Sequence, residues 1–204
     1  MKVGRPKDLE KRQQILDAAK ALFLMHGFHG SSMNQIAKAA SVTKLTVYNH
    51  FQDKENLFTC AIAETCEESI DTRTVSLDQH SDFNAALQQL CKLAIDLVNL
   101  PEALKLEHLL LELAAEQNPL VLPFYDASHN KLLKVWRVFF QQAIALNFIQ
   151  DANIEKQIHL LISLLLGQRH HEVLLGIRAI PNVEERQSIV EEAIEIFMLK
   201  YQKN

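Results

Sequence analysis

The sequence predicts an all-α protein with a small three-helix N-terminal domain and a larger C-terminal helical bundle, about nine helices in all. Three observations support this fold class. Hydrophobic residues make up 48% of 204 residues, with only five Gly and five Pro, which is typical of an ordered chain. Apolar residues recur every three or four positions. Alternating runs of β-branched residues, which would indicate strands, are missing.

Charge divides the chain into two parts. Residues 1–54 carry nine Lys and Arg against four Asp and Glu, a net +5, whereas residues 55–204 carry twelve against twenty-one, a net −9. A basic head on an acidic body suits nucleic-acid contact through the head alone. The alternative is chance clustering on a solvated surface. We place the functional boundary at residue 54, giving domains 1–54 and 55–204.

The sequence shows no segment for membrane insertion or export. No apolar run reaches the roughly 18 residues of a membrane-spanning helix, and the charged start MKVGRPKDLEKR does not resemble a signal peptide. We therefore expect a cytoplasmic protein. The three cysteines do not have zinc-site spacing, so we expect reduced thiols, with a redox switch as the less favoured alternative.

A helix is predicted over residues 8–26, with apolar residues on one face and Gly27 as its C-terminal stop. A short basic arm, GRPK, precedes this helix. Arg5 and Lys7 of the arm are candidate DNA contacts, either to phosphates or in the minor groove. A merely soluble terminus is the open alternative.

Two short helices follow and carry the strongest functional signal. Ser32 with Gln35 three residues later has the spacing of a capping box, and Thr43 can cap a second helix after a break at residues 39–41. On this second helix Val47 and Phe51 can be buried. The outward positions then hold one cation together with aromatic and hydrogen-bonding groups, namely Lys44, Leu45, Thr46, Tyr48, Asn49 and His50. This layout predicts a helix-turn-helix that binds DNA.

The segments TVYNHF at 46–51 and DKENLF at 53–58 resemble the signature of TetR-type transcriptional regulators. The resemblance extends without gaps over residues 5–62. It implies that Lys44, Leu45 and Thr46 approach base edges, that Tyr48 and His50 reach phosphates, and that Lys54 does so from the next helix. Ser32 and Asn49 complete the candidate contacts. Ser41 stands where the family often has Gly, and Leu45 where it often has a small residue or Pro.

The body is predicted to form helices over about 56–71, 83–97, 102–117, 123–144, 153–177 and 183–201, with residues 72–81 as a loop. The segment 158–167 is apolar on nearly all sides, which indicates a subunit interface with the last helix, or full burial within one subunit. TetR-like proteins dimerise through their last two helices. The predicted interface residues are Leu161, Ser163, Leu164, Gly167, Ile194, Phe197 and Met198.

Aromatic residues of the 123–144 helix are candidates to line an apolar cavity for a small hydrophobic effector. An ordinary hydrophobic core is at least as good an interpretation of this spacing. The candidate pocket residues are Leu90, Leu109, Leu113, Phe124, Tyr125, Trp136, Phe139 and Phe140.

Motifs for phosphate loops, serine nucleophiles and zinc proteases are missing, so no catalytic residue, cofactor or metal site is predicted. The favoured hypothesis is a homodimeric regulator, with repression favoured over activation. It would bind a near-palindromic duplex operator and be released by a small effector. The alternative is a helical ligand-binding or protein-interaction module without specific DNA binding.

Overall fold

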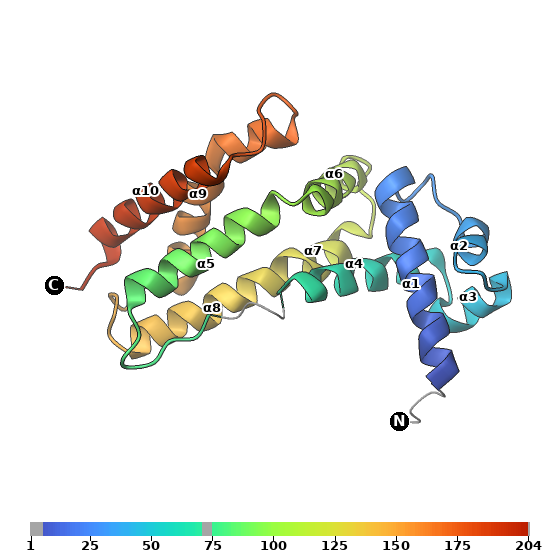
Figure 1. The fold of residues 1–204 in the computed structure, drawn as a ribbon, viewed down its shortest axis with the longest axis horizontal. Helices are drawn as coiled ribbons and strands as arrows, with labels where there is room; N and C mark the ends of the chain where they lie inside the picture. The colour runs from blue at the N-terminus through green and yellow to red at the C-terminus, as the bar shows by residue number, and fades with distance from the viewer. Residues whose placement is uncertain (1–5, 71–74, 204) are drawn as a thin grey trace. The chain divides into compact units, whose positions relative to one another are not determined.

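The computed structural model describes residues 6–70 and 75–203, and side chains within 8–65 and 75–203. The protein is all-α, as predicted (Figure 1). The N-terminal part holds four helices: α1 Pro6–His26, α2 Met33–Ala39, α3 Lys44–Phe51 and α4 Lys54–Ile70. Each lies within a few residues of its predicted position.

Six further helices are present in the described part of the body: α5 Phe83–Val98, α6 Pro101–Ala115, α7 Val121–Ala127, α8 His129–Ala145, α9 Ile154–Leu174 and α10 Val183–Tyr201. One expected element is divided. The single helix predicted over 123–144 is broken at Ser128, whose backbone leaves the helical region at φ −107° and ψ −80°. The Ser128 hydroxyl donates to the Phe124 carbonyl at 2.8 Å. A serine bonding to its own helix in this way competes with the regular backbone ladder.

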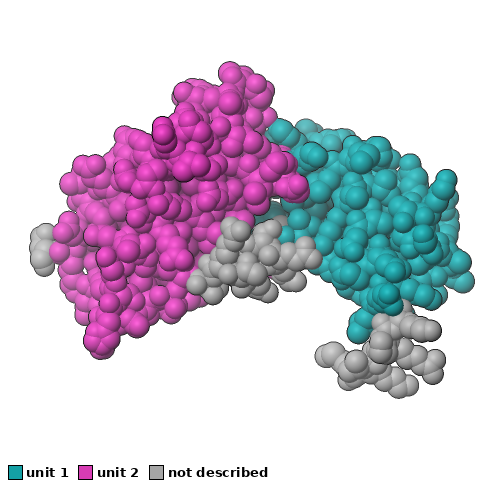
Figure 2. Space-filling model, in the orientation of Figure 1, with its two compact units in different colours: residues 1–69, 105–129 teal, residues 70–104, 130–204 magenta. Residues whose placement is uncertain are grey.

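The chain forms two compact units (Figure 2). Unit 1 contains residues 1–69 and 105–129, and unit 2 contains residues 70–104 and 130–204. Unit 1 therefore combines the helix-turn-helix with the second part of α6 and with α7. The functional boundary placed at residue 54 concerns which segments bind DNA, and it stays a prediction.

Unit 1 is held together by an aromatic cluster, defined here as Phe23, Phe28, Phe58 and Phe124. Phe58 of α4 meets Phe23 edge-on at 5.0 Å between ring centroids and Phe28 at 5.1 Å. Its ring also lies 5.7 Å from that of Phe124 in α7. All four side chains are buried. Through these contacts α1, α4 and α7 share one core. Each aromatic pair contributes roughly 0.5–1.5 kcal/mol to stability beyond its buried area.

Unit 2 has α5, α9 and α10 packed together. Trp136, Phe139 and Phe140 of α8 and Phe197 of α10 are fully buried in its core. A bidentate ion pair joins α8 to α9, with Arg137 Nε 2.6 Å from Glu155 Oε1. Hydrogen bonding from that guanidinium lowers the pKa of Glu155.

Membrane insertion and metal binding find no support in the described residues. Within 6–70 and 75–203 no helix is both long and apolar enough to cross a bilayer. Over the same ranges no three His, Cys, Asp or Glu side chains come together as a metal site would require. Burial raises the pKa of the Cys91 thiol and so opposes formation of its reactive thiolate. The side chain of Cys66 lies outside the described set.

The connection between α1 and α2 has no room for a side chain at Gly30. A Cβ there would lie 2.1 Å from the His26 carbonyl oxygen. Gly27, which ends α1 at φ 72°, has no comparable obstacle, because the nearest atom to its Cβ position would be Glu112 Oε2 at 3.6 Å.

We expect Gly30→Ala to lower the free energy of unfolding by about 2 kcal/mol, because backbone must shift to relieve the overlap. Gly27→Ala should cost only about 1 kcal/mol, the penalty of a left-handed alanine. Urea denaturation of both variants tests this order. An equal or smaller loss for Gly30→Ala would contradict the steric explanation.

Candidate nucleic-acid interface

The two helices of the predicted helix-turn-helix begin at the expected caps. The Ser32 hydroxyl oxygen accepts from the Gln35 backbone N–H at 3.3 Å, and its own hydrogen is directed to Gln35 Oε1 at 2.7 Å. Thr43 Oγ1 accepts from the Thr46 N–H at 3.1 Å. Each cap satisfies one of the unpaired donors at a helix start and contributes about 1 kcal/mol. Ser32 is exposed at the start of α2.

The turn between α2 and α3 is centred on a left-handed residue. Ser41 has φ 55°, its N–H donates to the Lys38 carbonyl, and the Val42 N–H donates to the Ala37 carbonyl. This pair of bonds is the Schellman arrangement that ends a helix. Serine thus occupies a conformation that usually calls for glycine, which costs about 1 kcal/mol.

Helix α3 buries one face and leaves the other open. Val47 and Phe51 have 0% and 1% relative exposure and pack in the unit 1 core. Leu45 is 68% exposed and Tyr48 40%, and Lys44 and Asn49 are also exposed. Of the positions predicted to face outward, four are exposed as expected, whereas Thr46 and His50 are half-buried. An exposed leucine beside a cation and two hydrogen-bonding groups suits contact with base edges and thymine methyl groups.

Contacts within α3 arrange this open face. The Lys44 ammonium lies 5.6 Å from the centroid of the Tyr48 ring, one helical turn away. The Thr46 hydroxyl, half-buried, lies 2.8 Å from that of Thr43. These contacts hold the first turn of α3 in place without covering Leu45 or Asn49.

His50 and Lys54 form contacts inside the protein that the sequence did not predict. His50 Nε2 lies 3.3 Å from Asp8 Oδ1 of α1. Lys54 Nζ donates to the carbonyl oxygens of Phe28 and Ser31 at 3.0 and 3.1 Å and lies 4.1 Å above the Phe28 ring. Lys54 therefore ties the start of α4 to the connection before α2. A phosphate contact by either residue stays a prediction.

Two residues of α1 that contact α3 could not be predicted from local sequence patterns. Asp8 is 42 residues from His50 in sequence, and Arg12 of α1 lies over the Phe51 ring at 5.2 Å. Both depend on the packing of α1 against α3. Arg5 lies outside the described residues, and so does the side chain of Lys7.

The predicted effector-pocket residues do not form one group. Leu109, Leu113 and Phe124 are buried in the core of unit 1, whereas Leu90, Trp136, Phe139 and Phe140 are buried in that of unit 2. Tyr125 is 39% exposed and its ring stacks on His129 at 4.8 Å. The aromatic pocket stays a prediction.

The predicted interface residues differ in exposure. Leu161 and Phe197 are fully buried within unit 2. Ser163 and Gly167 are exposed, and the remainder, Leu164, Ile194 and Met198, are partly buried. Of the seven, only these last five have exposed surface, and the dimer interface stays a prediction.

The two short helices, the tight turn between them and the mixed exposed face of α3 have the layout of a helix-turn-helix, the motif of many DNA-binding proteins. Models of known families identify the class further. The model "Bacterial regulatory proteins, tetR family" matches residues 15–60. The model "AefR-like transcriptional repressor, C-terminal domain" matches residues 85–203. The chain belongs to the TetR family of transcriptional regulators, which is not a family of enzymes.

Similarity to curated relatives is concentrated in the part of the chain that contains the helix-turn-helix. The regulator AcrR of Shigella flexneri is 48% identical over 61 residues, 30% of this chain and 28% of AcrR. The biofilm-operon negative regulator IcaR of Staphylococcus epidermidis is 25% identical over 136 residues, 60% of this chain and 74% of IcaR. The match to AcrR thus spans little more than a quarter of that relative.

Solved structures resemble the whole chain. A TetR-family regulator from Mesorhizobium loti has a TM-score of 0.86 at 27% identity, covering 98% of this chain and 100% of that one. The flavonoid-responsive regulator FrrA has a TM-score of 0.80 at 24% identity, covering 96% and 98%. At its identity FrrA shows the fold alone.

We expect Ser41→Gly to raise the free energy of unfolding by up to about 1 kcal/mol, because glycine adopts positive φ without a Cβ clash. Ala39→Gly, inside α2, should lower it by about 0.5–1 kcal/mol through the poor helix propensity of glycine. Denaturation curves of the two variants measure the contrast. If both substitutions destabilised equally, the strain attributed to Ser41 would be absent.

Proposed function

We propose that the protein is a homodimeric repressor that binds a near-palindromic operator through α3 and is released by a small effector. The exposed face of α3, with Lys44, Leu45, Tyr48 and Asn49 outward over a buried Val47 and Phe51, carries the DNA-binding part of the proposal. The net +5 of residues 1–54 supports attraction of that face to phosphates. Repression is favoured because the relative IcaR is named a negative regulator and the matching C-terminal family model is described as that of a repressor.

Dimerisation would proceed through α9 and α10. Their outer surfaces combine Ser163 and Gly167, small residues that allow close approach, with exposed apolar groups. Ile196 and Leu199 of α10 are 39% and 82% exposed. Covering such apolar side chains in a second subunit would remove them from water. A two-fold dimer would place its recognition helices about 34–36 Å apart, or a multiple of that distance, on a palindrome.

The effector would bind in the C-terminal part of the chain and oppose operator binding. Such opposition requires the ligand to prefer a conformation that binds DNA poorly, and linkage then makes the effect reciprocal. Selection of bound duplexes from a random pool at two salt concentrations tests the DNA-binding function. Recovery of a near-palindrome with steeply salt-dependent affinity is expected, and recovery of no motif would reject it.

Lys44→Ala should weaken binding to the selected operator by about 1–3 kcal/mol and relax the preference at one base position, because a base-edge contact is lost. Fluorescence anisotropy with single-base operator variants measures both effects. Lys92→Ala removes an exposed charge from α5 in unit 2 and is the matched control. Equal losses from the two variants would mean that Lys44 contributes only net charge.

Ser163→Arg should convert the dimer to a monomer, because it inserts a charge where two subunits would approach closely. The exposed position makes the change harmless to a single chain. Sedimentation equilibrium measures the assembly state. Leu122→Arg, at a 73% exposed position in unit 1, is the control and should leave the dimer intact. A Ser163→Arg dimer of undiminished stability would place the interface elsewhere.

A further inference from the structure

One side chain on the exposed face of α3 has no polar group. Leu45 is the second residue of the helix, which begins at Lys44, and it is 68% exposed. A leucine exposed singly on a protein surface needs no explanation. In a helix-turn-helix, however, the N-terminal residues of the second helix are those that contact base edges. At this position the chemistry of the side chain decides which base pairs are bound.

The backbone that carries Leu45 is fixed from both sides. Before it, Thr43 Oγ1 accepts from the Thr46 N–H at 3.1 Å and caps the first turn of α3. After it, the fully buried Val47 anchors the helix in the core of unit 1. The direction in which the Leu45 side chain leaves the helix is therefore set by the fold and not by contacts of its own.

The polar groups on either side of Leu45 are directed elsewhere. The Lys44 ammonium lies 5.6 Å from the centroid of the Tyr48 ring. The Thr46 hydroxyl lies 2.8 Å from that of Thr43, and Thr46 is half-buried. These contacts leave the end of the Leu45 side chain open, so an apolar group projects from the first turn of α3.

The four bases differ in what they present to such a group in the major groove. Guanine, adenine and cytosine present hydrogen-bond donors and acceptors, whereas thymine presents a methyl group at C5 beside its O4 acceptor. A leucine placed over a donor or acceptor removes it from water without supplying a hydrogen bond, which costs free energy. Against the thymine methyl group it buries apolar surface on both sides, which is favourable.

We propose that Leu45 is a specificity-determining residue that reads the C5 methyl group of a thymine in each operator half-site. A homodimer carries two copies of α3, so a near-palindromic operator contains this thymine twice, at symmetry-related positions. The recognised chemistry is the methyl group and not the pairing edge of the base. 5-Methylcytosine, which carries a methyl group at the same ring position, belongs to the same class of ligand.

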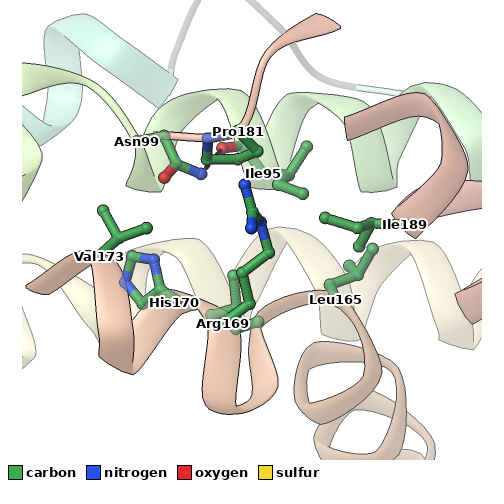
Figure 3. A pocket seen from close by; sticks show the side chains of 9 residues that line it. Ile95, Asn99, Leu165, Arg169, His170, Val173, Pro181 and Ile189 are labelled. Carbon is green, nitrogen blue, oxygen red and sulfur yellow. Dashed lines mark hydrogen bonds between the residues drawn. The ribbon is translucent and has the colours of Figure 1, made fainter. Parts of the chain in front are cut away.

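Thymine readout by Leu45 rests on the proposed function, because α3 must enter the major groove. It concerns the operator and not the effector. The pocket of unit 2 that Asn99 and Arg169 line, between α5, α9 and the start of α10, has about 10 Å³ of space (Figure 3). That is room for at most one water molecule, so this pocket takes no effector.

Replacement of each operator thymine by uracil, one at a time, tests the readout. Uracil keeps the pairing edge and lacks only the C5 methyl group. At the thymine under Leu45, the full-length protein should bind the uracil duplex about fourfold more weakly, the value of one buried methyl group. Fluorescence anisotropy with duplexes obtained by selection measures the affinities. At the same position 5-methylcytosine should be bound more tightly than cytosine by a similar factor.

Variants of the leucine assign the effect to this side chain. Leu45→Ala should bind the thymine and uracil duplexes equally well at that position, because the contact with the methyl group is lost. Leu45→Met keeps an apolar side chain of similar length and should retain the difference. Leu122→Ala removes a 73% exposed leucine outside the helix-turn-helix and is the control. It should give the uracil profile of the unaltered protein.

The readout is overturned if no thymine shows a uracil effect, or if the effect persists in Leu45→Ala. It is also overturned if Leu122→Ala abolishes the effect to the same extent. Selection of bound duplexes precedes these measurements and separates the two failures. An operator without a Leu45-dependent methyl effect would retain the regulator and reject thymine readout. Recovery of no motif would reject the proposed function, and the readout with it.

Discussion

The aromatic cluster of unit 1 is the constraint on which the DNA-binding surface depends. Phe58 packs against Phe23 and Phe28 from the N-terminal segment of unit 1 and against Phe124 from its second segment, residues 105–129. Its ring therefore joins the two segments. Lys54 adds a polar tie to the same place, because its ammonium bonds two carbonyl oxygens and lies over the Phe28 ring. The connection that precedes α2 is therefore fixed before any DNA contact forms. Val47 and Phe51 anchor α3 in the same core, and a helix held in this way would lose little conformational entropy on binding DNA.

Local signals were sufficient to predict the helix-turn-helix. Ser32 and Thr43 cap their helices through bonds that span three residues, and Val47 and Phe51 lie on one face by helical periodicity. Helix caps and the buried face of a helix depend on residues three or four positions apart in the sequence, so they can be predicted without knowledge of the tertiary structure. The left-handed turn could be suspected only by comparison with the family, because serine itself gives no signal for positive φ.

Features that depend on tertiary packing were not predictable in the same way. Periodicity indicated that the aromatic residues are buried but not against what, and the structure divides them between two cores. Arg169 and Asn99 line one pocket although 70 residues separate them. The break at Ser128 involves neither Gly nor Pro, and only the backbone angles reveal it. Helical periodicity can predict that a single residue is buried, but which residues come together in a site depends on the tertiary packing of several helices.

Under the proposed function, chain connectivity would offer a physical route between an effector bound in the body and the helix-turn-helix. The chain passes between unit 1 and unit 2 at residues 69–70, 104–105 and 129–130. The crossing at 104–105 lies inside α6, and the crossing at 129–130 lies at the start of α8. A helix is stiff because each residue is bonded to those four positions away, so under the proposed function a displacement of the first turn of α6 would be passed along that helix. In unit 1, α6 supplies Leu109 and Leu113 and is followed by Phe124, all in the core that contains Phe58. Ligand-dependent movement of α6 would thus alter the packing that holds the connection before α2. Because packed cores adopt discrete arrangements and do not deform continuously, such coupling, where it operates as proposed, would favour two alternative arrangements of the helix-turn-helix.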